Sequence, residues 1–223
     1  MNLIEVKVYS EQKLAYVFSD RSDFKKEEWC LFKKNGKTKI GKIRFIFSLK
    51  GEKSPHPVEK IEKANLKDKQ EFDHRRKIEK KAFEVASRKI LHYKLSMELA
   101  KVDYPLDADQ ITFYYTAKER VDFRALIRDL ARIFKVRIQM QQIGVRDKAK
   151  LLSGCGICGR EICCASFLNK KCGKLGSVNL EKARVQNLPL ISSKISGICG
   201  RLRCCLNFEY SIYNKVSKKP PES

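Results

Sequence analysis

A duplicated cysteine string is the feature that most constrains how this chain can fold. The first copy, GICGREICCASF, begins at Gly156, and the second copy, GICGRLRCCLNF, begins at Gly197. The copies are offset by 197 − 156 = 41 residues and share the pattern C-G-R-x-x-C-C. Two copies are too few for a solenoid. We therefore expect two similar half-sites in a loop-dominated, cysteine-rich region over residues 145–213, followed by a tail over residues 214–223.

The number and position of the cysteines bear on where the protein works. Eight of the nine cysteines lie between residues 155 and 205. The chain starts with MNLIEVKVYSEQK, which has no apolar signal segment, and no apolar run approaches the roughly 18 residues that a transmembrane helix needs. These features predict a soluble, cytoplasmic protein without a transmembrane segment. Cytosolic thiols are kept reduced, so clustered cysteines there indicate metal ligands or redox groups rather than disulfides.

The pattern of the strings favours an iron–sulfur cluster. Thiolates bind soft metals and iron–sulfur clusters, whereas structural zinc sites usually show C-x₂₋₄-C pairs, often with histidine. The only C-x-x-C pair starts at Cys155, and the three histidines lie outside the strings. Zinc and chemically idle thiols remain the alternatives. Cys30 is expected in the core, and Cys172 fits neither copy. The candidate ligands are Cys158, Cys163, Cys164, Cys199, Cys204 and Cys205, with Cys155 as a further candidate.

Other residues of the strings suggest how such a centre is tuned. Arg160 and Arg201 follow the first cysteine of each copy by two residues and could offset the negative charge of a thiolate-ligated cluster. Adjacent cysteines in an extended chain diverge, so one thiol of each pair is expected to serve one centre and its neighbour another centre, a partner subunit or the core. Phe167 and Phe208 occupy the same repeat position, and we expect them to pack over the site and exclude water.

Residues 1–50 have the pattern of a β-rich N-terminal part. Apolar and alternating runs predict four short strands, at residues 3–8, 14–18, 30–32 and 40–47. Asn35-Gly36 is a strong signal for a two-residue hairpin turn. The stretch from Gly51 to Asn65 contains two prolines and is typical of a charged linker.

Residues 66–144 are expected to form a two-layer α/β sandwich. Apolar side chains at helical spacing predict a long helix over residues 66–94, with a stripe made of Phe72, Phe83, Ala86, Ile90 and Tyr93. A hairpin follows, with strands over residues 97–104 and 111–116. After it come a helix over residues 123–134, capped by Asp122, and a final strand over residues 136–143. Together with the strand at 40–47, the order is β-α-β-β-α-β, the ferredoxin-like pattern. The whole chain is thus assigned to the α+β class.

The charge balance points to an anionic partner. Lys and Arg exceed Asp and Glu by 48 − 26 = 22, which favours nucleic acid, an acidic protein or an anionic membrane face. The long helix offers a dense basic face that is either a partner-binding or a solvated surface: Arg75, Arg76, Lys77, Lys80 and Lys81. A second charged group is expected to form helix caps and ordinary ion pairs, with a docking platform as the alternative: Arg120, Asp122, Arg124, Arg146 and Asp147.

Two longer stretches that contain the strings resemble a known family. The first starts at Phe113 and reads FYYTAKERVDFRALIRDLARIFKVRIQMQQIGVRDKAKLLSGCGICGREICCASFL. The second starts at Gln186 and reads QNLPLISSKISGICGRLRCCLNFE. Together they are similar to the polymerase-suppressor-type C-terminal conserved region, and most closely to bacterial RicT (YaaT) proteins. The resemblance is loose before Gln110 and tight over residues 111–209.

The resemblance implies a cofactor and partners. RicT-like proteins act with two small helical proteins, RicA and RicF, in a complex that carries 4Fe–4S clusters. That complex associates with the membrane-tethered ribonuclease Y and steers the maturation of some mRNAs. In spore-forming bacteria it affects sporulation, competence and biofilm formation. Cys155 and Cys172 depart from the family pattern and could complete an all-internal ligand set. The family's cluster-linked cysteines correspond here to Cys158, Cys163, Cys164, Cys199, Cys204 and Cys205.

We therefore expect a non-enzymatic iron–sulfur adaptor that regulates a ribonuclease Y complex. The sequence contains no P-loop, G-x-G-x-x-G, H-E-x-x-H or G-x-S-x-G motif. The alternative is a zinc-stabilised basic protein that binds RNA directly, which rests on the net charge. A redox enzyme that uses Cys155 and Cys158 is disfavoured, because this pair does not clearly open a helix after a strand.

Overall fold

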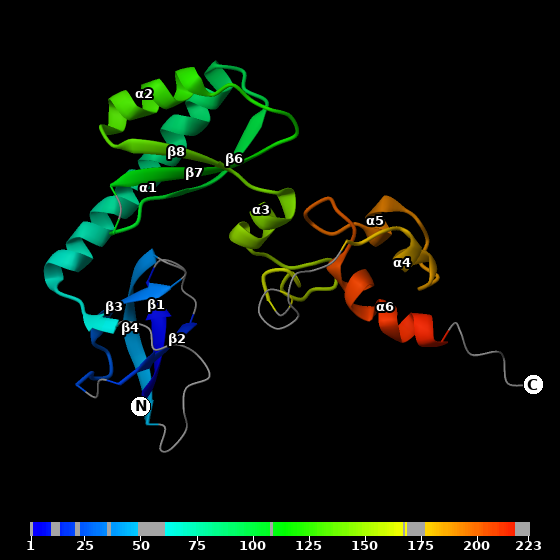
Figure 1. Ribbon diagram of the computed structural model, residues 1–223, viewed down its shortest axis with the longest axis horizontal. Helices are drawn as coiled ribbons and strands as arrows, with labels where there is room; N and C mark the ends of the chain where they lie inside the picture. The colour runs from blue at the N-terminus through cyan, green and yellow to red at the C-terminus, as the bar shows by residue number, and fades with distance from the viewer. Residues whose placement is uncertain are drawn as a thin grey trace, which may run out of the picture. The chain divides into compact units, whose positions relative to one another are not determined.

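The computed structural model describes residues 2–9, 14–20, 23–34, 37–48, 61–107, 109–166, 168 and 177–216. The chain divides into two compact units. The first contains Met1–Leu95, Val102–Phe113 and Asp122–Met140, and the second contains Ser96–Lys101, Tyr114–Val121 and Gln141–Ser223. Two sheets, several helices and a cysteine-rich C-terminal region are present (Figure 1), so the predicted α+β class is confirmed.

The N-terminal part is a five-stranded antiparallel sheet with the strand order β2-β1-β4-β3-β5. Its strands are β1 (Asn2–Val8), β2 (Leu14–Ser19), β3 (Trp29–Lys34), β4 (Lys37–Ser48) and β5 (Ile61–Lys63). The fifth strand lies within the stretch predicted as a linker, and that prediction is wrong for these residues: Ile61 is buried and pairs with Phe32 of β3. Asn35-Gly36 and residues 51–60 lie outside the described residues.

One face of this sheet forms a tight apolar core. Ile4, Val6 and Val8 alternate along β1 and are buried together with side chains from β2, β3 and β4. Cys30 is fully buried here, which confirms its predicted core position. Its thiol donates to the carbonyl of Gly41 at 3.6 Å, and burial raises its pKa to about 12. Gly41 is required because a Cβ atom there would lie 2.4 Å from Val6 Cγ1.

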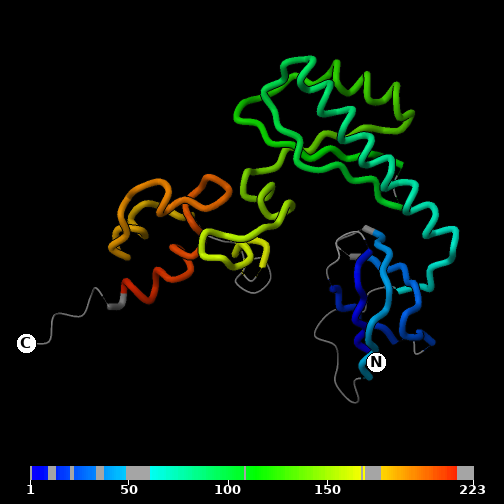
Figure 2. Tube along the Cα trace, turned by 180° about the vertical axis from the view of Figure 1, so that it is seen from behind, coloured from blue at the N-terminus to red at the C-terminus, as the bar shows by residue number. Residues whose placement is uncertain are grey.

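A three-stranded sheet, in the order β6-β7-β8, follows the long helix. The elements are α1 (Leu66–His92), β6 (Met97–Asp103), β7 (Gln110–Ala117), α2 (Arg124–Phe134) and β8 (Arg137–Gln142). The two-layer arrangement of helices and sheet is seen in Figures 1 and 2. The ferredoxin-like topology is wrong, because β4 pairs with β1 and β3 in the other sheet and β8 lies directly beside β7.

The two helices of this layer are joined by packing and by one carboxylate. Small and branched side chains of the two helices are buried: Ala82, Ala86, Ile90, Leu126 and Leu130. Asp129 accepts from Lys89 Nζ at 2.5 Å and from the hydroxyl of Tyr93 at 2.6 Å. Phe83 was predicted on the buried stripe, but it is 37% exposed and Ala82 occupies the buried position instead.

Helix boundaries agree with the sequence to within two residues. Helix α1 ends at His92 rather than at residue 94, and α2 begins at Arg124 rather than at residue 123. The N-cap residue of α2 is Phe123 and not Asp122 as predicted, although Asp122 accepts a hydrogen bond from the Arg124 backbone N–H at 3.0 Å. None of the helices in the described part of the chain is long and apolar enough to cross a membrane.

The C-terminal part consists of short helices joined by turns. They are α3 (Val145–Leu152), α4 (Glu181–Arg184), α5 (Ser192–Ile195) and α6 (Cys204–Val216). A small core of Ala183, Ile195 and Leu206 holds the last three helices together, with Leu202 packed against it. The second cysteine string runs from α5 into α6, so this core fixes its position.

Candidate metal centre

The two cysteine strings fold into the same backbone structure. In the first, the N–H of Gly156 donates to the carbonyl of Arg160 at 2.7 Å, and an isolated antiparallel β-bridge pairs the backbones of Cys155 and Glu161. In the second, the N–H of Gly197 donates to the carbonyl of Arg201 at 2.8 Å, and a β-bridge of the same kind pairs the backbones of Ser196 and Leu202. Every one of these positions is shifted by 41 residues, for example 197 − 156 = 41. The repeated sequence is therefore a repeated structure.

Each string needs a glycine at its turn. Gly159 has a φ angle of +76° and Gly200 has a φ angle of +74°. Side chains with a Cβ atom rarely adopt this left-handed region, because the Cβ atom crowds the backbone. The turn brings the first cysteine of each string, Cys158 and Cys199, back toward the double cysteine.

The double cysteines lie at the start of helical turns and not in an extended chain. Cys204 opens α6, and in the first string the N–H of Ser166 donates to the carbonyl of Ile162 at 3.1 Å, as in a helix. Consecutive residues of a helix point about 100° apart. The two thiols of each pair therefore diverge, as expected. The cause is the rotation between consecutive residues of a helical turn and not the alternation of an extended chain.

All six cysteines of the strings line one cavity of about 100 Å³. Cys158 is exposed, whereas the other five thiols are partly buried. Gly156, Gly197 and the side chains of Ile157 and Ile198 complete much of the wall. The structure thus brings together every ligand candidate except Cys155, which is exposed and does not line the cavity. Cys172 lies outside the described residues.

The thiols interact crosswise between the two strings. Burial raises the pKa of Cys163, and the thiols of Cys205 and Cys158 raise it further. Burial raises the pKa of Cys164, and Cys199 adds to this rise. Burial raises the pKa of Cys204 to about 11, and the thiols of Cys164, Cys163 and Cys199 add to this rise.

Among these interactions we distinguish two sets of three thiols that the repeat relates, the crossed thiol groups, each with two members from one string and one from the other. The two groups also interact with each other, because Cys163 raises the pKa of Cys204. The first group is Cys158, Cys163 and Cys205, and the second is Cys199, Cys204 and Cys164. Exchanging the two strings converts one group into the other. Among the described residues, no three Cys, His, Asp or Glu side chains are already placed to hold a single metal ion.

Two arginines face the thiols, and they are not the two that the sequence suggested. Arg203 lines the cavity, and Arg146 of α3 donates to the carbonyl of Leu202 at 3.4 Å. Within the described part of the chain, the buried Nε atoms of both arginines have no hydrogen-bond partner. By contrast, Arg160 is exposed and does not line the thiol cavity, and Arg201 lines a different cavity beside Glu98.

These arginines favour negatively charged sulfur. Burial is the main influence on the pKa of Cys164 and Cys204, and Arg146 opposes the rise that it causes. Arg203 has the same effect on Cys205, whose pKa is also raised mainly by burial. Sequence reasoning missed Arg146 as a partner of the thiols, because it precedes the first string and was grouped with surface ion pairs.

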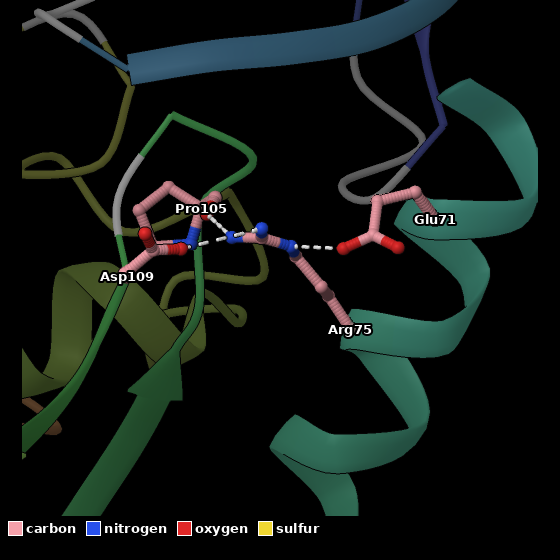
Figure 3. Close-up of polar contacts among 4 residues, drawn as sticks. All are labelled: Glu71, Arg75, Pro105 and Asp109. Carbon is pink, nitrogen blue, oxygen red and sulfur yellow. Dashed lines mark hydrogen bonds and ion pairs between the residues drawn. The ribbon is translucent and has the colours of Figure 1, made fainter. Parts of the chain in front are cut away.

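The remaining predicted site residues lie elsewhere. Phe208 is 48% exposed and does not line the cavity, and Phe167 lies outside the described residues. In α1, the guanidinium of Arg75 is bound to Glu71 at 2.7 Å and to the carbonyl of Pro105, with Asp109 at 3.8 Å (Figure 3). Arg75 is therefore a structural residue rather than part of an open basic face. The side chains of Lys77, Lys80 and Lys81 are exposed, while Arg76 is partly buried.

The remaining charged and imidazole candidates form ordinary contacts or stay at the surface. Asp122 pairs with Arg124 at 3.8 Å, as expected for an ordinary ion pair. His74 and His92 are exposed, and His56 lies outside the described residues.

Comparison with known proteins matches two segments of the chain. Residues 59–143 match the PSP1 C-terminal conserved region, and residues 177–220 match the third domain of PSP1-like proteins. Over these two segments the chain is therefore similar to PSP1-like proteins. The resemblance inferred from the cysteine strings is thereby confirmed. The PSP1 region contains α1, the three-stranded sheet and α2, whereas the third domain contains the second cysteine string.

Relatives of the chain occur in bacteria and yeasts. The stage 0 sporulation protein YaaT of Bacillus subtilis is 47% identical over 63% of this chain and 50% of its own length. An uncharacterised protein of Schizosaccharomyces pombe is 38% identical over 39% of this chain and 12% of its own length. Protein PSP1 of Saccharomyces cerevisiae is 40% identical over 20% of this chain and 5% of its own length. The chain thus spans half or less of each relative, and no solved structure matches it.

Proposed function

We propose that the two cysteine strings together bind an iron–sulfur centre. The observation that carries this proposal is that six thiols from two segments line one cavity of about 100 Å³. A structural zinc ion takes four ligands, so six thiols around one cavity exceed what one zinc ion needs. An all-sulfur donor set without histidine suits iron–sulfur chemistry. A cluster would supply electron transfer or redox sensing, or it would act as a structural clamp.

The crossed thiol groups suggest how the ligands divide. Cys158, Cys163 and Cys205 would serve one centre, and Cys199, Cys204 and Cys164 would serve the other. Each group then has three thiolates, one fewer than a 4Fe–4S cluster with four cysteine ligands. Cys155, Cys172 or a residue of a partner protein could supply the fourth. The buried guanidinium groups of Arg146 and Arg203 would offset the negative charge of thiolate-bound iron.

Anaerobic purification followed by iron, sulfide and zinc analysis tests this proposal. We expect iron and acid-labile sulfide together with absorbance near 400 nm, and we expect Cys158→Ser with Cys199→Ser to abolish both. Cys30→Ala is the matched control, because this cysteine lies in the core of the N-terminal sheet and does not line the cavity. Zinc without sulfide, or normal iron loading in the double variant, would overturn the proposal.

We also propose that the loaded protein is a non-enzymatic adaptor of a complex with RicA-like and RicF-like proteins and ribonuclease Y. Its similarity to a stage 0 sporulation protein supports a regulatory role. The two strings place Ile157 and Ile198 at equivalent positions beside the cavity, where they are 65% and 62% exposed. Exposed apolar side chains beside a candidate cofactor site are typical of a surface that a partner covers.

Anaerobic co-purification with RicA-like and RicF-like proteins tests the adaptor role. Ile157→Ser with Ile198→Ser should weaken complex formation while iron content stays unchanged. Leu66→Ser is a matched control, because this residue is 81% exposed and belongs to the other unit. Equal binding by the isoleucine double variant and the wild type would refute this surface as the docking site.

A further inference from the structure

The outer face of the N-terminal sheet carries a row of exposed aromatic side chains. Residues that pair directly across strands lie on the same face of a sheet. Glu5 of β1 pairs with Tyr16 on one side and with Phe45 on the other. Leu3, two residues earlier, pairs with Phe18 and Phe47. These two rows lie on the face opposite to the apolar core, because Ile4 and Val6 point the other way.

Three of these aromatic rings are open to solvent. Tyr16 is 55% exposed, Phe45 is 44% exposed and Phe47 is 47% exposed. The ring centroids of Phe45 and Phe47 lie 6.2 Å apart, so neighbouring rings form one surface. A contiguous exposed apolar patch of this kind on a folded domain indicates a binding surface.

Cationic side chains surround the rings. Lys26 Nζ lies 4.9 Å from the centroid of the Phe45 ring, and the guanidinium carbon of Arg44 lies 5.7 Å from the same centroid. In the next row, Lys7 is exposed and pairs with Lys42. That row continues to Trp29 of β3, whose ring lies 4.7 Å from Lys69 Nζ.

Two acidic side chains that the structure describes at this face are engaged by their neighbours. Glu5 accepts from the hydroxyl of Tyr16 at 3.1 Å and is itself nearly buried. Glu27 forms an ion pair with Lys42 at 2.5 Å. The open groups of the face are therefore aromatic rings and ammonium or guanidinium groups, which together attract an anionic, aromatic ligand rather than an acidic protein alone.

We infer that this face, defined by Tyr16, Phe45 and Phe47 with Lys7, Lys26 and Arg44, binds single-stranded nucleic acid. Unpaired bases expose flat π-faces that stack on aromatic side chains, and the phosphates between them are neutralised by Lys and Arg. In a duplex the bases are already stacked and their faces are not available. The inference goes beyond the proposed iron–sulfur centre and does not depend on it, because the face lies in the first unit.

Fluorescence anisotropy with a labelled 12-nucleotide oligouridylate tests the inference on the full chain. We expect binding that weakens with salt, and binding that is about tenfold or more weaker in Phe45→Leu with Phe47→Leu, which keep apolar bulk but lose the rings. Oligothymidylate should bind similarly, because stacking does not need the 2′-hydroxyl. Phe83→Leu is the matched control, since this phenylalanine of α1 is also partly exposed.

Two outcomes of this titration would overturn the inference: equal affinity of the wild type and the double variant, or equal affinity for a duplex of the same length. Crosslinking of the wild type to an oligonucleotide that contains 4-thiouridine provides a second measurement that does not depend on variant folding. Adducts in residues 14–19 or 42–48 would support the inference, and adducts confined to other segments would refute it. Iron content, measured on the same samples, should be unchanged, so failure here is separable from failure of the proposed centre.

Discussion

The guanidinium of Arg146 donates a hydrogen bond to the backbone carbonyl of Leu202 at 3.4 Å, which joins α3 to the second cysteine string. Its Nε is buried and has no hydrogen-bond partner among the described residues. A buried donor without a partner costs free energy, typically about 1–3 kcal/mol. Sulfur atoms bound in the adjoining thiol cavity would give this donor the acceptor that it lacks.

Arg146→Gln should make the thiols of the second group harder to ionise. Burial raises the pKa of Cys164 and Cys204, and Arg146 opposes this rise. Removing the positive charge should therefore shift thiolate formation at both cysteines to higher pH, and iron should load more slowly near pH 7. Alkylation rates resolved by mass spectrometry across pH 7–10 measure the shift. Arg160→Gln, an exposed neighbour, is the control, and an equal shift in both variants would contradict the assignment.

Gly159→Ala and Gly200→Ala should each disturb one string. Both glycines have φ angles near +75°, and a non-glycine residue there costs about 1–2 kcal/mol. We expect lower thermal stability of the C-terminal part and a reduced iron content for each variant. Gly144→Ala is the control, because its φ angle is −73°. Unchanged iron content in both string variants would show that the turn geometry does not matter for loading.

Cys30 should be the least reactive of the described cysteines. Its thiol is fully buried, and burial raises its pKa to about 12. Because the pKa in the folded state exceeds the unfolded value of about 8.5, the stability that the neutral thiol contributes is present below that value and is lost as the pH rises toward about 12. At pH 8 under native conditions, we expect Cys158 to react with a thiol reagent quickly and Cys30 only after unfolding. Rapid native labelling of Cys30 would contradict its place in the core.

Asp129→Asn should weaken the junction between α1 and α2. The hydrogen bond from Lys89 lowers the pKa of Asp129, and the hydroxyl of Tyr93 acts in the same direction. A lowered pKa means that the carboxylate stabilises the fold above its unfolded pKa of about 3.9, and that this stabilisation is lost as the pH falls through the folded value. At pH 7 the variant should have a lower melting temperature than the wild type. Lowering the pH to 3 should reduce the melting temperature of the variant less than that of the wild type. Glu84→Gln on the exposed side of α1 should change neither value.

The sequence was sufficient to predict that the two cysteine strings resemble each other, but not which residues surround the thiols. The repeated spacing of glycine and cysteine is local information, whereas the meeting of the two strings at one cavity is a tertiary effect that the spacing did not predict. Arg146 comes from a separate helix, and the packing that turns it toward the thiols is a tertiary effect that no local pattern contains. Arg160 and Arg201 looked suitable because of their spacing, yet both follow the turn glycines Gly159 and Gly200 directly and are exposed.

Most of the strands and the helices α1 and α2 were predictable, but the strand pairing was not. Alternation of apolar residues identified β1, β2, β3, β4, β6, β7 and β8, whereas β5 and the short helices of the C-terminal part were missed. It did not reveal that β4 belongs to the N-terminal sheet, because strand pairing depends on contacts between distant segments. The choice of Ala82 over Phe83 for the buried position of α1 has a related cause, since close packing against α2 favours the smaller side chain.

The crossed thiol groups also have a consequence for chain entropy. A centre that includes both Cys163 and Cys205 would close a loop of 205 − 163 = 42 residues, and one that includes Cys164 and Cys199 would close a loop of 35 residues. By the loop-closure relation used for disulfides, a covalent link across about 40 residues restricts the unfolded chain and raises its free energy by about 4 kcal/mol at 25 °C. Loading with a centre would then stabilise the folded C-terminal part by linking its two cysteine strings, and loss of iron would remove this stabilisation.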